Sequence, residues 1–346
     1  MMPDNYIEPV DYKSSGVDIE AGNMAVKAIK DRVRSTFNAN VLSELGSFGG
    51  LYRLDKTAWD SPILVSSTDG VGTKLLVAIK AQVYNTVGQD LVNHCVNDIL
   101  VQGALPQFFL DYIGVGKLKG EIISQIIDGF VKACRENSCA LIGGEMAEMP
   151  GLYQEHDFDL AGTIIGLVEE AQLLPRSSIQ AGDQLIGLPS TGLHTNGFSL
   201  ARKVLFEKMG LKVDSYVEEL SGSLASKLLA VHKSYLPILN PYLQDAGLKA
   251  LAHITGGGIA GNLSRVLPEG LGAEIDLPNS KIPALFHLIQ KGGNVNIQVM
   301  RQSFNLGIGM ICVVDSKLAD TLLAVQGALH LGELSESTKA DKVIFK

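Results

Sequence analysis

The chain has 346 residues, more than one hydrophobic core of ordinary size holds, so we expect two domains. Hydrophobic residues make up 46% of it and charged residues 19%, a balance that is typical of globular proteins and argues against intrinsic disorder. Acidic side chains outnumber basic ones by 37 to 29, which gives a net charge of −8. This acidic chain, without a Lys/Arg-rich run, predicts neither a nucleic-acid partner nor binding to a membrane surface.

The start of the chain and its cysteines indicate a compartment. The first 16 residues show no basic stretch followed by an apolar one, and no apolar run approaches the ~20 residues that span a bilayer. The spacing of the cysteines predicts free, buried thiols rather than disulfides or a metal site; they are Cys95, Cys134, Cys139 and Cys312. We therefore predict a cytoplasmic protein.

The first half of the chain alternates between helical and extended patterns. Apolar residues with helical period predict helices over residues 20–35, 86–103 and 121–135. Runs of β-branched and aromatic residues predict strands at 63–68, 108–115, 139–142 and 157–168. On the helix over 86–103, the polar side chains gather on the face opposite the apolar one; they are Asp90, Asn93, His94 and Asn97.

A polar stretch over residues 169–183 predicts a domain boundary, so we divide the chain into residues 1–170 and 171–346. The second half again mixes both patterns. It predicts strands at 184–188, 251–255, 273–277, 296–300 and 307–314, and helices at 196–208, 224–244, 259–266, 283–290 and 317–328. Each half is therefore expected to be an α/β or α+β domain.

Acidic or amide side chains stand at three places in the first half, two of them beside glycines: Asp69-Gly70-Val71-Gly72-Thr73-Lys74, Asn97-Asp98 and Gly143-Gly144-Glu145. Backbone N–H groups of such turns converge on anions, and a hard cation such as Mg²⁺ would join phosphate to the carboxylates. Asp69, Asp98 and Asp90 are the candidate Mg²⁺ ligands, and Lys74 is a candidate phosphate contact. Alternatively, these are ordinary tight turns and a solvated helix face. A P-loop is absent from the sequence.

Two further glycine turns follow predicted strands in the second half. Gly256-Gly257-Gly258 begins a G-x-G-x-x-G pattern with Asp276 about twenty residues later, which is typical of dinucleotide sites. Too little chain follows for a whole dinucleotide domain, so a turn that holds one phosphate is the better interpretation. Gly192-Leu193-His194-Thr195-Asn196-Gly197 is either a second binding turn or a capped helix start.

Two common kinds of site lack their sequence signals. The seven histidines form no H-x-x-x-H or H-E-x-x-H pattern, so the spacing predicts no zinc site. No G-x-S-x-G elbow occurs, which argues against a serine hydrolase.

Several motifs together carry a family resemblance. Asp98-x4-Gly103-Ala104-x-Pro106 resembles the superfamily of aminoimidazole ribonucleotide synthetase-like enzymes. Within it, the chain is most similar to the phosphoribosylformylglycinamidine cyclo-ligase family. The segments that carry this likeness are 16–23 (GVDIEAGN), 68–74 (TDGVGTK), 143–151 (GGEMAEMPG), 253–258 (HITGGG) and 262–268 (NLSRVLP).

The resemblance implies an ATP-dependent ring closure that converts formylglycinamidine ribonucleotide to aminoimidazole ribonucleotide with release of ADP and phosphate. It also implies a homodimer in which the N-terminal sheets of two subunits pair into a barrel, beside a larger C-terminal α/β domain. The cofactors implied are ATP, as a substrate, and Mg²⁺.

Residue roles follow from the matched motifs. The predicted ATP site consists of Asp69, Gly70, Gly72, Thr73, Lys74, Asn97, Asp98 and Glu145. The predicted substrate site consists of Gly192, His194, Thr195, Asn196, Gly256, Gly257 and Gly258. Proton transfer is assigned first to His253 and then to His194, with Lys74 on the transferred phosphate.

Three other functions remain open from the sequence. Another ATP-dependent phosphoryl-transfer enzyme of the superfamily, such as a small-molecule kinase, would use the same aspartates and glycines. A regulatory subunit would bind the nucleotide without turning it over. An oxidoreductase would bind NAD at residues 256–261.

Overall fold

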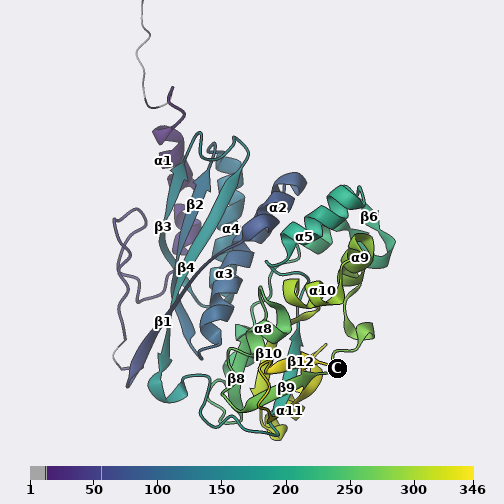
Figure 1. The fold of residues 1–346 in the computed structure, drawn as a ribbon. Helices are drawn as coiled ribbons and strands as arrows, with labels where there is room; N and C mark the ends of the chain where they lie inside the picture. Colours follow the sequence, from purple (N-terminus) through teal and green to yellow (C-terminus); the bar gives the residue numbers. More distant parts are fainter. Residues whose placement is uncertain (1–11, 13, 56) are drawn as a thin grey trace, which may run out of the picture.

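The computed structural model describes residues 12, 14–55 and 57–346, and it contains two large sheets, one in each half of the chain (Figure 1). The first eleven residues, where a leader was predicted to be absent, lie outside the described residues. Among the described residues, no helix combines the length and the apolar character needed to cross a bilayer. The predicted class, two domains with mixed sheets and helices, is confirmed.

The first sheet has four strands in the order β1-β4-β2-β3. Strand β4 runs antiparallel to β1 and β2, whereas β3 runs parallel to β2. Helices α3 and α4 cover one face of this sheet, and α1 packs against α4 (Figure 1). The elements of this half are α1 (Ile19–Arg34), β1 (Pro62–Gly70), η1 (Gly72–Lys74), α2 (Leu75–Ala81), α3 (Asn85–Leu100), β2 (Leu105–Val115), α4 (Gly120–Glu136), β3 (Ala140–Glu148), β4 (Phe158–Glu169) and η2 (Glu170–Gln172).

The second sheet has six strands in the order β12-β9-β11-β5-β10-β8. Only the β12–β9 pair in this sheet is parallel. Its strands are β5 (Gln184–Pro189), β8 (Leu248–His253), β9 (Leu271–Ile275), β10 (Ile308–Val314), β11 (Leu329–Glu336) and β12 (Val343–Phe345). A two-stranded sheet pairs β6 (Tyr216–Val217) with β7 (Gly222–Ser223).

Short helices surround the second sheet, and most of them begin or end where the sequence predicted. They are α5 (Phe198–Arg202), η3 (Lys203–Lys208, a π-helical segment), η4 (Glu218–Leu220), α6 (Leu224–Leu228), α7 (Leu236–Leu239), η5 (Asn240–Tyr242), α8 (Gly258–Leu263), η6 (Asn279–Lys281), α9 (Ala284–Gly293), α10 (Ile297–Ser303) and α11 (Ser316–Leu323).

Helices α3 and α4 pack unusually closely because each contributes a glycine to the crossing. A Cβ on Gly88 would lie 2.3 Å from the carbonyl oxygen of Ile126, and one on Gly129 would lie 2.4 Å from that of Asn85. This close packing fixes α3 against the sheet, and α3 carries several of the predicted site residues.

The polar face of α3 is not exposed to solvent, although one interpretation of the sequence expected it to be. Asp90, Asn93, His94 and Asn97 are all buried, so the interpretation as a solvated face is wrong. Figure 1 shows the reason: α3 lies on the side of the first sheet that faces the C-terminal domain. The polar side chains therefore fill the space between the domains.

Three predicted elements are wrong in detail. The helix predicted over 224–244 is broken after α6, and α7 carries a proline in its first turn, where the missing N–H ends any continuous helix. The strand predicted over 296–300 is helix α10, because the side chain of Asn296 accepts a hydrogen bond from the Gln298 N–H and caps it. Strand β3 runs on through Gly143, Gly144 and Glu145, which were expected to follow it.

Several elements of the structure had no predicted counterpart, among them the small sheet of β6 and β7. Helix α2 directly follows the glycine turn at Gly72, and β11 and β12 lie in the last twenty residues or so of the chain. The four cysteines are free and buried, as the sequence predicted.

Candidate active site

Side chains from distant segments meet between the two domains. His94 comes from the middle of α3, His253 ends β8, and His194 and His232 lie in loops that precede α5 and α7. Their ring centroids are 5.2 Å apart for His94 and His253 and 5.1 Å apart for His232 and His253. Asp69, at the end of β1, joins them. The structure thus unites predicted ATP-site and substrate-site residues.

His94 lies against the two predicted metal-binding aspartates. Its Nε2 is 2.8 Å from Asp69 Oδ2 and 3.7 Å from Asp98 Oδ2. Burial alone would lower the pKa of His94, but the carboxylates outweigh it and raise the pKa. Burial opposes the charge of Asp69 as well, yet its hydrogen bond to His94 lowers the pKa of Asp69 overall. His94 is therefore a hydrogen-bonding partner of these carboxylates, which favour its charged form, a role that its place on the polar face did not reveal.

Both ring nitrogens of His253 have partners. Nδ1 lies 2.8 Å from Asp98 Oδ1, and Nε2 lies 3.0 Å from Nε2 of His232. Burial lowers the pKa of His253 despite the opposing effect of Asp98, so the ring is neutral near pH 7. Sequence reasoning missed His232, because it lies in the segment that was predicted to be helical.

His194 stacks on His232 and offers one free polar atom. The ring centroids are 4.0 Å apart with planes 20° apart, and the Thr191 N–H donates to His194 Nε2 at 3.2 Å. Burial lowers the pKa of His194 far below its usual range, so the neutral ring carries its proton on Nδ1. That buried N–H has no hydrogen-bond partner in the structure. Thr195 Oγ1 bridges His94 Nδ1, at 2.8 Å, and His232 Nδ1, at 3.4 Å.

Lys74 and Asp90 form a fully buried ion pair and not the expected phosphate and metal contacts. Lys74 Nζ is 2.8 Å from Asp90 Oδ2 and also donates to the carbonyl oxygens of His194 and Ala230, at 3.1 and 2.8 Å. Neither side chain of the pair is exposed. The three partners use all three protons of the ammonium group. In this structure Asp90 is thus a partner of Lys74, and its assignment as a Mg²⁺ ligand stays a prediction; Lys74 has no proton left for a nucleotide.

Asn97 also holds a loop in place. Its Nδ2 donates to the Lys233 carbonyl at 2.8 Å, and its Oδ1 accepts the Tyr235 N–H at 2.9 Å. Both ends of the amide thus fix the loop that carries His232. Its Nδ2 also lies 3.3 Å from His232 Nε2, so both N–H groups have partners here, and the predicted contact of Asn97 with ATP stays a prediction.

The turn at Gly70, Gly72 and Thr73 lies at the edge of the cluster. The Gly70 N–H donates to Asp69 Oδ1 at 2.7 Å, and Thr73 Oγ1 lies 3.0 Å from Ser199 Oγ across the domain boundary. Gly72 and Thr73 are exposed. This stretch can therefore meet a ligand from solvent.

The glycine turn after β8 is held by Asn262. Its Nδ2 donates to the Gly258 carbonyl at 2.8 Å, while Gly257 and Gly258 have φ angles of +98° and +66°. Asn196 lies beside the turn, since its Oδ1 is 3.4 Å from the position of a Cβ on Gly256, and its Nδ2 is buried without a partner. Asn196, from the turn that begins at Gly192, therefore lies beside the turn at Gly256, and the assignment of both turns to the substrate stays a prediction.

Glu145 lies apart from this cluster. It is exposed on β3, an edge strand of the first sheet, and pairs in register with Tyr112. It also lines a cavity of about 130 Å³ beside α1, together with Asp111. The structure of one chain does not bring Glu145 to the other predicted ATP-site residues.

Asp111 gives a test of the environment around Glu145. Burial, with a smaller contribution from the Glu145 carboxylate, raises the pKa of Asp111 to about 7. Because the folded-state pKa lies above the unfolded value, the neutral acid stabilises the fold at low pH and this stability is lost as pH rises toward 7. Relative to the wild type, the free energy of unfolding of Asp111→Asn should rise by ~2 kcal/mol between pH 4 and pH 8. This figure already includes a reduction by roughly half for the partial exposure of the side chain. Urea unfolding at both pH values measures it. Asp320→Asn, on an exposed face, is the control, and a gain that is equal at both pH values would contradict the expectation.

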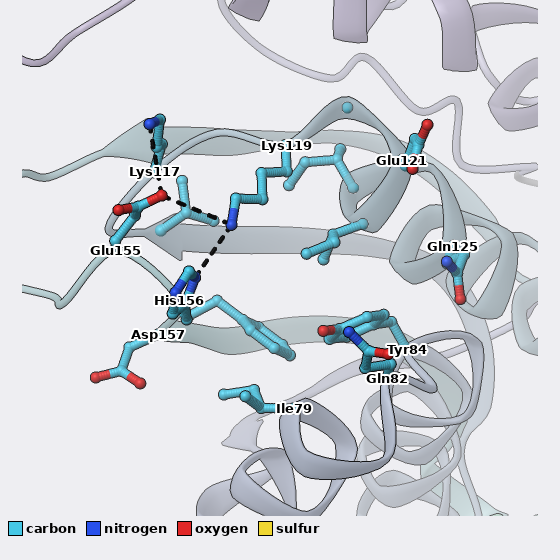
Figure 2. Close-up of a pocket in the computed structure, with 15 residues that line it drawn as sticks. Ile79, Gln82, Tyr84, Lys117, Lys119, Glu121, Gln125, Glu155, His156 and Asp157 are labelled. Atoms are coloured by element: carbon cyan, nitrogen blue, oxygen red, sulfur yellow. Dashed lines mark hydrogen bonds and ion pairs between the residues drawn. The ribbon is translucent and has the colours of Figure 1, made fainter.

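A separate concave surface of about 810 Å³ lies at the other end of α3, beside Tyr84 (Figure 2). Part of its charged rim is paired internally: Glu155 Oε1 is 3.5 Å from Lys117 Nζ and 3.8 Å from Lys119 Nζ, which also lies 3.1 Å from His156 Nδ1. It contains none of the predicted site residues. We therefore place the candidate active site between the domains and not here.

The donors around Asp69 and Asp98 do not suit the predicted Mg²⁺ between them. Mg²⁺ takes six oxygen ligands and few others. Here an imidazole nitrogen of His94 lies against Asp69, and one of His253 lies against Asp98. Ser67 Oγ donates to the remaining Asp98 oxygen at 3.1 Å. The mixed nitrogen and oxygen environment is not that of a magnesium site.

Family models and curated proteins match the chain along most of its length. Residues 52–168 match the model of "AIR synthase related protein, N-terminal domain", and residues 180–342 match that of its C-terminal domain. The phosphoribosylformylglycinamidine cyclo-ligase of Alkaliphilus oremlandii (strain OhILAs) is 45% identical over 335 residues, which are 95% of this chain and 98% of the relative. That of Geobacillus sp. (strain WCH70) is 49% identical over 326 residues, 94% and 92% of the two chains.

Solved structures share the fold at low sequence identity. Thiamine-monophosphate kinase from Stenotrophomonas maltophilia K279a superimposes with a TM-score of 0.67 at 18% identity over 92% of this chain and 96% of its own. The hydrogenase maturation protein HypE in complex with ATP gives a TM-score of 0.59 at 19% identity over 92% and 90%. These two likenesses concern the fold, whereas the identity to the cyclo-ligases is high along nearly the whole length. The chain therefore belongs to the phosphoribosylformylglycinamidine cyclo-ligase family.

Proposed function

We propose that this protein converts formylglycinamidine ribonucleotide to 5-aminoimidazole ribonucleotide at the expense of ATP, with release of ADP and phosphate. One observation carries the proposal: the space between the domains is lined by Asp69 and Asp98 from one domain and by His194 and the Gly256 turn from the other. A nucleotide on one side and a ribonucleotide on the other would meet there.

The chemistry explains why two ligands must meet. A formamide oxygen is a poor leaving group, so it is first phosphorylated by ATP. The amidine nitrogen of the same molecule then attacks the activated carbon, and the carbon–oxygen bond breaks with release of phosphate. An enclosed site favours this step because the two reacting groups are held together, which lowers the barrier by ~7 kcal/mol or more in well-oriented cases.

Roles for the histidines follow from their free atoms. We propose that His194 donates its unpartnered Nδ1–H to the substrate, since a buried N–H without a partner gains most from a ligand oxygen. His253 is a positioning residue in this proposal, because one ring nitrogen holds Asp98 and the other contacts His232. The hydroxyl of Thr195 contacts Nδ1 of both His94 and His232, so it couples the positions of the protons on the two rings.

The two ligands are assigned to different turns. We propose that Gly70, Gly72 and Thr73 contact the ATP phosphates, and that Gly192, Asn196 and the turn Gly256–257–258 hold the ribonucleotide phosphate. Glu145 would contact ATP only if the nucleotide reached the edge of the first sheet at β3. Mg²⁺ enters as the ion that accompanies ATP and neutralises its phosphates; no step and no protein ligand is assigned to it, given the donors described above.

Dimerisation and location complete the proposal. Residues 1–170 would form the nucleotide-binding and dimerisation domain and residues 171–346 the C-terminal domain. The face of the first sheet opposite α3 and α4 exposes Leu64, at 72% of its surface, beside the partly exposed Ile165. Pairing this face with that of a second subunit would bury it, as the barrel of a homodimer requires.

We also propose a cytoplasmic location, where purine precursors are made.

The function is tested by supplying the purified protein with ATP and formylglycinamidine ribonucleotide and measuring ADP and aminoimidazole ribonucleotide together. We expect the two products in equal amounts, from a particle whose light-scattering mass is that of two chains. ADP without the imidazole product would instead favour a kinase of the same superfamily, for which the fold likeness to thiamine-monophosphate kinase is the supporting observation. ATP binding without ADP would favour a regulatory subunit.

A further inference from the structure

Three buried N–H groups in one segment of the C-terminal domain have no hydrogen-bond partner. They belong to His194 Nδ1, Asn196 Nδ2 and Arg202 Nε. A buried donor without a partner costs free energy, so each of these groups gains from a ligand that brings acceptor oxygens. All three are donors, which indicates an acceptor-rich ligand such as a phosphoryl group. His194 and Asn196 already have roles in the proposed function, whereas Arg202 has none.

Arg202 differs from the other arginines in the part of the chain that the structure describes. Its guanidinium group forms no hydrogen bond and no ion pair with any described residue, and it alone has a buried nitrogen without a partner. Arg32, Arg34 and Arg176, in contrast, bond to carboxylates or to carbonyl oxygens. Arg202 is half-buried, so part of its side chain stays accessible to a ligand. Its five N–H donors match the oxygens of a phosphate.

The place of Arg202 on α5 directs it toward the glycine turn that precedes α2. Ser199 Oγ lies 3.0 Å from Thr73 Oγ1 in this turn, and the ring of Phe198 lies 5.6 Å from Lys74 Nζ directly after it. Arg202 follows Phe198 by four residues and Ser199 by three, so it lies between them on the same flank of the helix. Because helical side chains lean toward the N-terminus, Arg202 leans back toward these two contacts.

A further contact shows that the same flank continues along α2. Lys80 Nζ, near the end of α2, lies 5.9 Å from the ring of Phe206 in η3. Phe206 follows Arg202 by four residues. Contacts with the N-terminal domain therefore occur both one turn before Arg202 and one turn after it. Arg202 thus lies on the flank that faces Gly72 and Thr73, which are exposed.

We propose that Arg202 binds the γ-phosphate of ATP from the C-terminal side of the space between the domains. This inference rests on the proposed function, in which Gly70, Gly72 and Thr73 contact the ATP phosphates. Lys74, the cation that the motif assigned to the transferred phosphate, uses all of its protons on partners inside the protein. Arg202 supplies the positive charge that Lys74 does not bring to this phosphate.

A guanidinium group suits the transfer of this phosphoryl group. As the formamide oxygen forms its bond to the γ-phosphorus, the bond from that phosphorus to ADP breaks, its electron pair stays with ADP, and the formamide N–H proton leaves to water. Negative charge is then spread over the outer oxygens of the phosphoryl group, and a fixed cation beside them lowers the barrier. Arginine contacts two such oxygens at once, whereas lysine is a point charge.

The first test compares the affinities for ATP and ADP, each with Mg²⁺ and without the ribonucleotide. Arg202→Met keeps most of the apolar stem, and it should weaken ATP binding by about 10–100-fold, the worth of a hydrogen bond to a charged group. ADP binding should change little, because ADP lacks the γ-phosphate. Lys203→Met removes the same charge from the next residue, which is exposed, and should bind both nucleotides as the wild type does. Equal losses for ATP and ADP, or no loss, overturn the proposal.

Turnover separates a phosphate contact from a packing role. Arg202→Met should slow the release of ADP by roughly 10³-fold, as loss of an arginine from a transferring phosphoryl group does. Arg202→Lys should recover much of the ATP affinity but little of this rate, since a point charge does not replace the planar fork. Faster turnover in Arg202→Met than in Arg202→Lys would mean that the stem matters and not the charge, which overturns the proposal.

A measurement on the wild type keeps the test independent of how the variants fold. Phenylglyoxal modifies accessible arginines, and mass spectrometry of peptides locates the modified residues. The β,γ-imido analogue of ATP should protect Arg202 more than ADP does and should leave Arg135, exposed on α4, unprotected. Modification of Arg202 that the analogue does not slow overturns the proposal, as does protection by ribose 5-phosphate alone. Neither nucleotide binding nor protection involves ring closure, so their failure leaves the proposed function to its own product assay.

Discussion

Replacing Lys74 by Met is expected to lower the free energy of unfolding by ~3–5 kcal/mol, because the carboxylate of Asp90 then stays buried without its partner. Turnover should also fall by roughly 100-fold, since Lys74 holds the carbonyls of His194 and Ala230 and a displaced catalytic loop costs about that much. The affinity for ATP should change by only a few-fold. Urea unfolding, steady-state kinetics and equilibrium binding of ATP measure the three quantities.

Two further variants separate this interpretation from the role predicted from the motif. Lys80→Met removes an exposed lysine from helix α2, which directly follows Lys74, and should change stability by about 0.5 kcal/mol or less. Adding Asp90→Asn to Lys74→Met should recover part of the lost stability, because the unpaired charge is gone. If Lys74→Met had normal stability but no longer bound ATP, Lys74 would be a contact of the ATP phosphates, as the motif predicts.

The fold was largely accessible from the sequence because most of its elements have strong periodic patterns. Helices α1, α3 and α4 and most strands of the two sheets follow an apolar spacing that is visible in the sequence. The errors occurred where local chemistry overrides the pattern. Alternating residues around Val299 are typical of a strand, yet the cap at Asn296 starts a helix there. Strands β11 and β12 are short or half exposed, so their pattern is weak.

The active site was only partly accessible because its composition depends on how the domains pack. Motifs identified Asp69, Asp98, His194 and His253, which do meet. His94 and His232 belong to no motif in this chain, and their spacing gives no metal signal. They join the cluster because α3 turns its polar face to the other domain and because the predicted helix over 224–244 is broken at the loop of His232. The polar face of α3 did carry a signal. It holds two amides, a histidine and an aspartate, and such side chains are buried only where hydrogen-bond partners are present.

The packing of the domains also explains why Lys74 and Asp90 have structural contacts in place of the ligand contacts that were predicted for them. Lys74 and Asp90 lie sixteen residues apart, and each belongs to a polar pattern that suggests a ligand contact. In the folded chain they neutralise each other and bond to the backbone of the loops at His194, Ala230 and His232. A buried ion pair of this kind joins three segments across the domain boundary. The two residues thus position the site without lining it.

Replacing Gly258 by Ala is expected to have the second largest effect, and it tests the turn that we assign to the ribonucleotide phosphate. A Cβ on Gly258 would lie 1.8 Å from the Arg301 carbonyl oxygen, and φ is +66°, so the turn or α10 must shift. Left-handed strain and overpacking together should cost ~3 kcal/mol of unfolding free energy. The KM for the ribonucleotide should rise more than the KM for ATP, because only the former binds at this turn in the proposal.

Gly261→Ala is the matched control for this change. It lies three residues further along in α8, where a Cβ meets nothing within 4 Å and φ is helical, so alanine should stabilise the helix by about 0.5–1 kcal/mol. If Gly258→Ala raised both KM values equally, the turn would not distinguish the two ligands. If it raised neither while lowering stability, the turn would be structural only, and the ribonucleotide phosphate would have to bind beside the unpartnered amide of Asn196. The ratio of the two KM changes therefore decides which glycine turn recognises the substrate.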